Sequence, residues 1–248
     1  MSASSHGRVV AIINNSSHRH FQTRSHYGIL FSYSLLINLV LTILFIGSTG
    51  VEARRRSSIS SLITENLYNS IFLHKDDNAC LARNFYTYNS FIQAASCFPK
   101  FGNTGDIATR RRKIAAFLAQ ISQETTGRWA TAPDGPFAWG LCFKEEINPQ
   151  SNYCDATNTR WPCFPGKSYH GRGPIQLSSW NYNYGQAGRA VGFDGLRNPE
   201  IVANNSLIAY KTAFWFWMTV QTPKPSCHGV MVGKYVPTEA YLAANRTA

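Results

Sequence analysis

The sequence predicts a single, mostly α-helical domain with a long irregular segment at its centre. A chain of 248 residues that is 44% apolar and only 15% charged can bury one sizeable core. Apolar residues recur at three- and four-residue steps within 61–98, 109–125 and 201–218, which is the helical period. Residues 128–185 show no such period, yet they carry eleven Trp, Tyr and Phe residues. An irregular stretch of this length is uncommon in a compact domain unless it builds a site.

The N-terminal part predicts an export or membrane element. Gly28 to Gly47 is a mostly apolar run without a charged residue, and its length of about twenty residues matches a bilayer. Val51-Glu52-Ala53 then resembles a signal-peptidase site. We expect residues 1–53 to be a polar leader with a cleaved signal peptide or, as the alternative, a retained membrane anchor. The remainder, a basic linker at 54–66 and a folded domain at 67–248, would then be secreted or lie in a lumen.

The cysteines support a secreted or lumenal location for the folded domain. All six follow the apolar run, at Cys80, Cys97, Cys142, Cys154, Cys163 and Cys227. Six cysteines in a secreted domain indicate a disulfide framework, whose connectivity spacing alone does not give. The chain has no C-x-x-C and no H-E-x-x-H motif, so we expect no metal site and no cofactor.

Helices are expected at both ends of the folded domain. Within 61–98 we expect helices separated by a turn at Asp76-Asp77-Asn78, followed by a loop at 99–106 that contains two glycines. A further helical segment is expected over 201–218. Its apolar run 213–217 is more typical of a core than of a ligand platform.

The clearest helix is expected over 109–125. Its apolar face, spaced by the helical rule, holds Ile114, Phe117, Leu118 and Ile121. The basic cluster 110–113 at its start is expected to be solvated surface. Glu124 is the next position on the apolar face. A carboxyl partly withdrawn from water there would have its charged form disfavoured, which suits a general acid.

Further carboxylates and polar aromatic residues follow in the irregular segment. Glu145 and Glu146 could supply a second carboxyl group, and inverting glycosidases place their two carboxyl groups roughly 6.5 to 9.5 Å apart. Aromatic faces bury sugar rings, and amides bind hydroxyl and N-acetyl groups. The aromatic and amide or hydroxyl residues expected to line a glycan site are Trp129, Trp139, Trp161, Tyr169, Tyr182, Tyr184, Gln176, Ser178, Asn181 and Asn183.

The net charge of +11 would also suit an acidic surface or nucleic acid. The basic cluster 110–113, however, lies away from the aromatic segment in sequence. We therefore expect no nucleic-acid partner.

Several longer strings resemble plant-type chitinases of glycoside hydrolase family 19. They are Gln123-Glu124-Thr125-Thr126-Gly127, the stretch 130–140 (ATAPDGPFAWG), His170-Gly171-Arg172-Gly173-Pro174-Ile175-Gln176 and Asn181-Tyr182-Asn183-Tyr184-Gly185. The likeness runs from about residue 67 to residue 246. It implies a mostly helical, two-lobed, lysozyme-like α+β fold with long irregular loops and a central cleft for β-1,4-linked N-acetylglucosamine. It also implies endo-acting hydrolysis with inversion, in plant defence or a cell-wall context.

The resemblance also assigns roles to residues. Glu124 matches the general acid and Glu146, rather than Glu145, the general base. Ser178, with Ser179 as the alternative, would hold the attacking water. The positions that it implies for substrate binding are Gln176, Tyr182, Asn183, Trp161 and Tyr169. The disulfides that it implies are Cys80 to Cys142 and Cys154 to Cys163.

This chain departs from the family pattern at Gln123, where the family has His, and at Arg128, where it has Gly. We expect no appended chitin-binding module, and we expect the family's C-terminal segment to be absent. A catalytically impaired, glycan-binding relative is therefore the alternative function. The expected partner is chitin or its oligosaccharides, and we expect a monomer.

Overall fold

The structure, a computed structural model, describes residues 59–238 except 128, 130, 136 and 178–179. The chain divides into two units, Met1–Thr49 and Gly50–Ala248, and only the second contains described residues. The predicted leader, the signal or anchor segment and most of the linker lie outside them, so these boundaries stay a prediction. Within 59–238, where described, no helix is both long and apolar enough to cross a bilayer.

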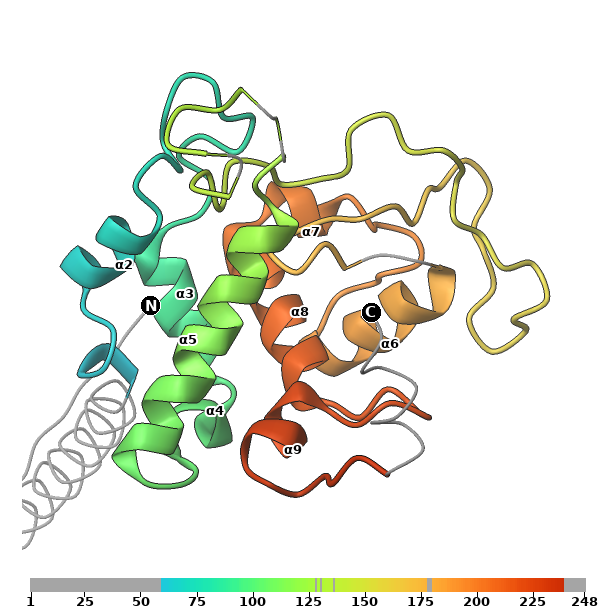
Figure 1. The fold of residues 1–248 in the computed structure, drawn as a ribbon. Coiled ribbons are helices and arrows are strands. Elements are labelled where there is room, and N and C mark those ends of the chain that lie inside the picture. Colours follow the sequence, from blue (N-terminus) through green and yellow to red (C-terminus); the bar gives the residue numbers. More distant parts are fainter. Residues whose placement is uncertain (1–58, 128, 130, 136, 178–179, 239–248) are drawn as a thin grey trace, which may run out of the picture. The chain divides into compact units, whose positions relative to one another are not determined.

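Helices make up most of the regular structure, as predicted (Figure 1). They are α2 (Glu65–Ile71), α3 (Tyr88–Ser96), α4 (Pro99–Asn103), α5 (Ile107–Glu124), α6 (Asn181–Val191), α7 (Ile201–Asn204), α8 (Ser206–Met218) and α9 (Cys227–Met231). Between α5 and α6 the described residues form turns and isolated bridges. The predicted long irregular segment is therefore present.

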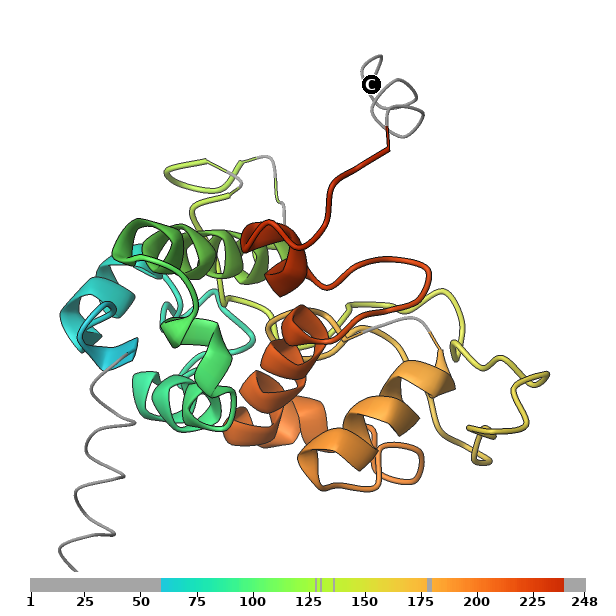
Figure 2. The ribbon, with the colours of Figure 1, turned by 90° about the horizontal axis from the view of Figure 1, so that it is seen from below.

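The core is built around α8, which packs against α3, α6, α7 and α9. Seen from below, α8 lies between α3 and α6 (Figure 2). Phe214 of α8 stacks on Phe117 of α5 with ring centroids 4.6 Å apart, and it meets Phe101 of α4 edge-on at 4.8 Å. These aromatic contacts confirm that most of the apolar run 213–217 belongs to the core, whereas Phe216 is only partly buried.

Helix α5 carries the predicted apolar face into that core. Its start is capped by Asp106, whose carboxylate accepts the backbone N–H of Thr109 at 2.7 Å. The prediction of a fully solvated basic start was wrong at Lys113, which is completely buried and donates to the carbonyl of Lys100 at 3.3 Å. The reason is tertiary: α4 and α9 both pack against α5.

One other local prediction was wrong, and the helical prediction for 201–218 was confirmed with one interruption. The expected loop at 99–106 begins as helix α4, because Pro99 occupies a first helical position, where its missing N–H and fixed φ are suited to a helix start. The segment 201–218 is divided into α7 and α8 at Asn205. This residue is extended, and its side chain accepts the N–H of Ile208 at 3.1 Å, which starts a new helix.

Two disulfides anchor the irregular segment, Cys80–Cys142 and Cys154–Cys163, the pairs that the resemblance implied. Cys97 and Cys227 are free thiols. Trp139 is buried beside the first disulfide rather than lining a glycan site. It stacks on His74, and its ring N–H donates to the carbonyl of Pro133 at 2.7 Å.

Candidate active site

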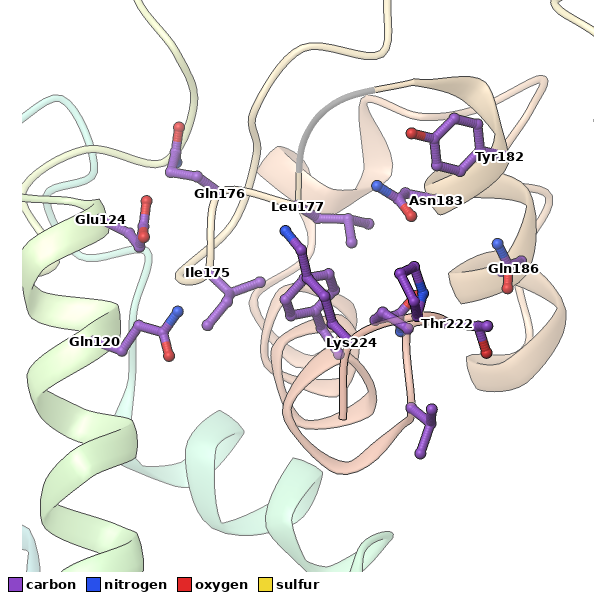
Figure 3. A pocket seen from close by; sticks show the side chains of 14 residues that line it. Gln120, Glu124, Ile175, Gln176, Leu177, Tyr182, Asn183, Gln186, Thr222 and Lys224 are labelled. Atoms are coloured by element: carbon purple, nitrogen blue, oxygen red, sulfur yellow. The ribbon is translucent and has the colours of Figure 1, made fainter. Parts of the chain in front are cut away.

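A groove of about 670 Å³ lies between the C-terminal end of α5 and the N-terminal half of α6 (Figure 3). The loop 175–177 and the segment 220–224 supply the remaining walls. Its lining is mostly polar, so it offers hydrogen-bonding groups to a hydroxylated ligand. The lining residues are Gln120, Glu124, Ile175, Gln176, Leu177, Tyr182, Asn183, Gln186, Phe216, Val220, Gln221, Thr222, Pro223 and Lys224.

Glu124 is the last residue of α5 and lies at the edge of this groove, on the side where Gln176 is found (Figure 3). Its position follows from helical phase, because Phe117 and Ile121 fix the face of α5 that turns inward. Glu124 itself is exposed, so the partial burial that we expected is wrong. The helix ends there, and the next two residues, Thr125 and Thr126, are buried, so Glu124 is left exposed beside the groove.

Gln176 reaches the groove from a tight hairpin. Arg172 pairs with Leu177 across this hairpin, and Gln176 has a φ of 45°, an uncommon left-handed value for a residue other than glycine. Its side-chain amide donates to the carbonyl of Gly173 at 3.0 Å. The amide also lies over Gly171, where a Cβ would be 2.8 Å from its Oε1. The hairpin therefore holds the amide in one orientation toward the ligand space.

Glu146 lies on the extended segment that bridges to this hairpin at Arg172, and it is only partly exposed. Its Oε1 accepts the hydroxyl of Tyr153 at 2.6 Å, and its Oε2 accepts the N–H of Gly171 at 3.2 Å. The Tyr153 hydroxyl has a raised pKa, chiefly because it donates to that carboxylate. Glu146 is not among the lining residues of the groove, but Gly171 connects it to Gln176, which is.

Tyr153 was missed by the sequence analysis. It has a φ of 52° in an irregular loop, and no periodic pattern or motif indicated that it would reach Glu146. The segment 221–224 was also missed. It forms a short bridge with backbone bonds between Gln221 and Lys224 of 2.7 and 3.1 Å, and it brings the Lys224 cation to the groove. A polar run with two prolines was the only signal of a turn there.

The predicted substrate-binding residues are divided between groove and core. Tyr182 and Asn183 lie on α6 and line the groove with Gln176 (Figure 3). Tyr169 is fully buried, its hydroxyl donating to the carbonyl of Leu196 at 2.9 Å, so the structure does not place it at a ligand surface.

Trp161 is half-buried and packs its ring against Gly185 of α6, and it is not among the residues that line the groove. Tyr184 is also buried, contrary to the expectation that it lines the site. Three positions of interest lie outside the described residues. They are Ser178, its alternative Ser179, and Arg128, where the chain departs from the family pattern.

Among the described residues, no three His, Cys, Asp or Glu side chains come together in a way that could hold a metal ion. The arrangement offers carboxylates for acid–base chemistry. Glu124 borders the groove. Glu146 borders the hairpin that forms part of the groove wall. Amide groups and a tyrosine face the same space.

Comparison with known proteins decides the family. The sequence pattern described as "Chitinase class I" of glycoside hydrolase family 19 matches residues 62–248. The chain belongs to glycoside hydrolase family 19. Membership confirms the predicted enzyme class, an endochitinase-type glycoside hydrolase, at the level of the family.

The family relatives are mostly plant chitinases. Chitinase 10 of Oryza sativa subsp. japonica is 64% identical over 225 residues, which cover 86% of this chain and 77% of the rice protein. Endochitinase CH25 of Brassica napus is 60% identical over 188 residues, which cover 76% of this chain and 58% of that protein. The chain thus spans little more than half of the Brassica relative.

Solved family 19 structures confirm the fold class. The class IV chitinase from Zea mays shares 42% identity with a TM-score of 0.53, over 64% of this chain and 71% of the maize chain. Chitinase C from Streptomyces griseus shares 35% identity with a TM-score of 0.57, over 69% and 74%. The predicted mostly helical, two-lobed, lysozyme-like fold is therefore the fold of this family 19 chain.

Proposed function

We propose that this chain hydrolyses chitin, the β-1,4-linked polymer of N-acetylglucosamine, by internal cleavage with inversion. Glu124 is the general acid and Glu146 the general base. The observation that carries the proposal is the polar groove with Glu124 at its rim, joined through Gln176 and Gly171 to Glu146. The relatives named endochitinase support the substrate class.

In this mechanism the two carboxyl groups have different tasks. Glu124 gives its proton to the leaving glycosidic oxygen, and Glu146 takes a proton from the water that attacks the opposite face of the sugar. A sugar bound over the exposed Glu124 would remove water from it and favour its protonated form before cleavage. Glu146 is held by Tyr153 and Gly171, which both donate hydrogen bonds to its charged form.

Substrate recognition would come from neutral groups. Gln176 and Asn183 offer amide donors and acceptors that match the N-acetyl and hydroxyl groups of the sugar. Tyr182 adds a ring face with a polar end. Ser178, or Ser179 as the alternative, is proposed to hold the attacking water, and Trp161 to support α6 from behind.

We also propose that the folded domain works outside the cell as a monomer, in defence or at a cell wall. This proposal rests on the apolar run at 28–47 and on the two disulfides, which form in oxidising compartments. Secretion of the full chain with loss of the first 53 residues, measured by N-terminal sequencing, would support it.

The direct test is hydrolysis of chitin hexamer by the wild type and by the variants Glu124→Gln and Glu146→Gln. Each substitution keeps the side chain's shape but removes its ability to donate or accept the catalytic proton. We therefore expect kcat to fall by roughly 10²- to 10⁴-fold. The matched control is Glu65→Gln on α2, a helix that contributes no lining residue, and it should keep wild-type kcat.

If the wild type binds the hexamer without turnover, the chain is a glycan-binding relative and this proposal is wrong. The proposal is equally wrong if either glutamine variant keeps the wild-type rate.

A further inference from the structure

The neighbour of the proposed base, Glu145, belongs to a buried charge network. Arg172 is only 5% exposed, and its guanidinium donates to the carbonyl of Ser168 at 2.9 Å and to the hydroxyl of Tyr184 at 3.0 Å. Its Nε lies 3.5 Å from Oε2 of Glu145. Among the described residues, Glu145 is the one carboxylate within ion-pair distance of this cation. A buried guanidinium that loses its counter-ion is strongly destabilised.

His170 completes the network. Its Nε2 is 3.4 Å from Oε2 of Glu145, and its Nδ1 is 2.9 Å from Oγ of Ser168 and 3.3 Å from Nη2 of Arg172. Burial lowers the pKa of His170, Arg172 lowers it further, and the carboxylates of Glu145 and Glu146 oppose the shift. At neutral pH the imidazole is therefore mostly uncharged, and Glu145 is left as the counter-ion of Arg172.

This network lies on the strand that orients Glu146. Glu145 pairs with Arg172 across an antiparallel bridge, and Gly173 donates to the carbonyl of Lys144 at 2.8 Å. Gly171 exchanges two hydrogen bonds with Glu146. The backbone N–H of Glu146 donates to the Gly171 carbonyl at 2.8 Å, and the Gly171 N–H donates to the side-chain Oε2 at 3.2 Å. The backbone next to Arg172 therefore bonds directly to the Glu146 carboxylate.

We propose that Glu145 is a positioning residue for Glu146, acting through its ion pair with the buried Arg172. The ion pair holds the strand at 171–173 in register, and the strand in turn presents the Gly171 N–H to the carboxylate. Glu145 touches neither substrate nor attacking water in this account. Its effect on turnover rests on the proposed function, whereas its effect on the geometry of Glu146 does not.

The test compares Glu145→Gln, which removes the charge, with Glu145→Asp, which keeps it. The primary readout is amide hydrogen exchange at Gly171, measured by NMR, because that N–H bonds directly to Glu146. We expect exchange to be roughly tenfold faster in Glu145→Gln, the scale of a weakened hydrogen bond to a charged group, with partial rescue in Glu145→Asp. Glu65→Gln is the matched control and should leave Gly171 unchanged.

A second readout follows the His170 imidazole in the same samples. Because Glu145 raises the pKa of His170 against the effects of burial and Arg172, its removal should shift the NMR titration of His170 to lower pH. A merely structural defect elsewhere would not produce this shift. Glu145→Asp should keep the titration near its wild-type position.

Kinetics then separate the two proposals. Faster Gly171 exchange together with a fall in kcat of roughly tenfold at constant KM supports both. Faster exchange in a chain whose wild type does not cleave chitin hexamer supports the positioning role and contradicts the proposed function. Gly171 exchange and kcat both within twofold of wild type in Glu145→Gln would overturn the positioning role.

Discussion

At the scale of single residues, the two proposed catalytic carboxylates are held differently, Glu124 by helix α5 and Glu146 by irregular loops. Both side-chain oxygens of Glu146 accept hydrogen bonds from irregular parts of the chain. The donors are the Tyr153 hydroxyl and the Gly171 N–H. Donors placed in advance spare a charged group the cost of reorganising water around it. We infer that the loop at 144–153 and the hairpin at 171–177 act together as the support of one carboxylate.

Tyr153→Phe tests that support. The substitution keeps the ring, including its edge contact with Trp180 at 6.4 Å between centroids, and removes only the hydroxyl. Loss of a hydrogen bond to a charged group should lower kcat on chitin hexamer by about tenfold while KM stays within about twofold. Tyr235→Phe, outside the groove lining, is the control. A wild-type kcat in Tyr153→Phe would show that the bond does not orient the base.

At the scale of elements, the short helix α9 fixes the segment that closes one wall of the groove. Residues 221–224 directly precede α9, and α9 packs against α5 and α8. His228 is the buried residue of α9, only 8% exposed, and within the described residues its Nδ1 has no hydrogen-bond partner. The charges that face it are all positive: Lys113 on α5, Lys234 after α9 and Lys100 on α4.

These surroundings predict an acid-sensitive element. Burial, with Lys113, Lys234 and Lys100, lowers the pKa of His228 from 6.5. Below pH 6.5 the unfolded chain therefore binds more protons than the folded one, so stability is complete above that pH and is lost as the pH falls. Urea unfolding at pH 7.5 and pH 5 should show a smaller acid loss for His228→Gln than for the wild type. An equal loss in both would contradict this role of His228.

At the scale of the whole molecule, the parts that sequence predicted well are those set by local periodicity. The apolar face of α5, the core run in α8 and the irregular segment between α5 and α6 all follow from spacing alone. The misses depend on tertiary contacts that spacing does not encode. Lys113 is buried because α4 and α9 cover it, and Tyr169 is buried beneath Leu196.

The candidate site divides in the same way. The position of Glu124 follows from the helical phase of α5, but its exposure does not, because exposure depends on where the following turn goes. Tyr153 and the bridge at 221–224 come from irregular loops. The Cys154–Cys163 disulfide follows Tyr153 directly, and the bridge at 221–224 is closed by backbone bonds between Gln221 and Lys224. Motif resemblance, not periodicity, brought Gln176, Tyr182 and Asn183 together before the structure did.

The central claim is a single displacement at the anomeric carbon, with Glu124 and Glu146 on opposite faces of the sugar. The most direct measurement is the anomeric configuration of the new reducing ends, followed by proton NMR during the first minutes of chitin hexamer cleavage. The account predicts that the α-anomer forms first and that the β-anomer appears only later by mutarotation, because water attacks from the face opposite the leaving group. Initial products in the β-configuration would contradict it.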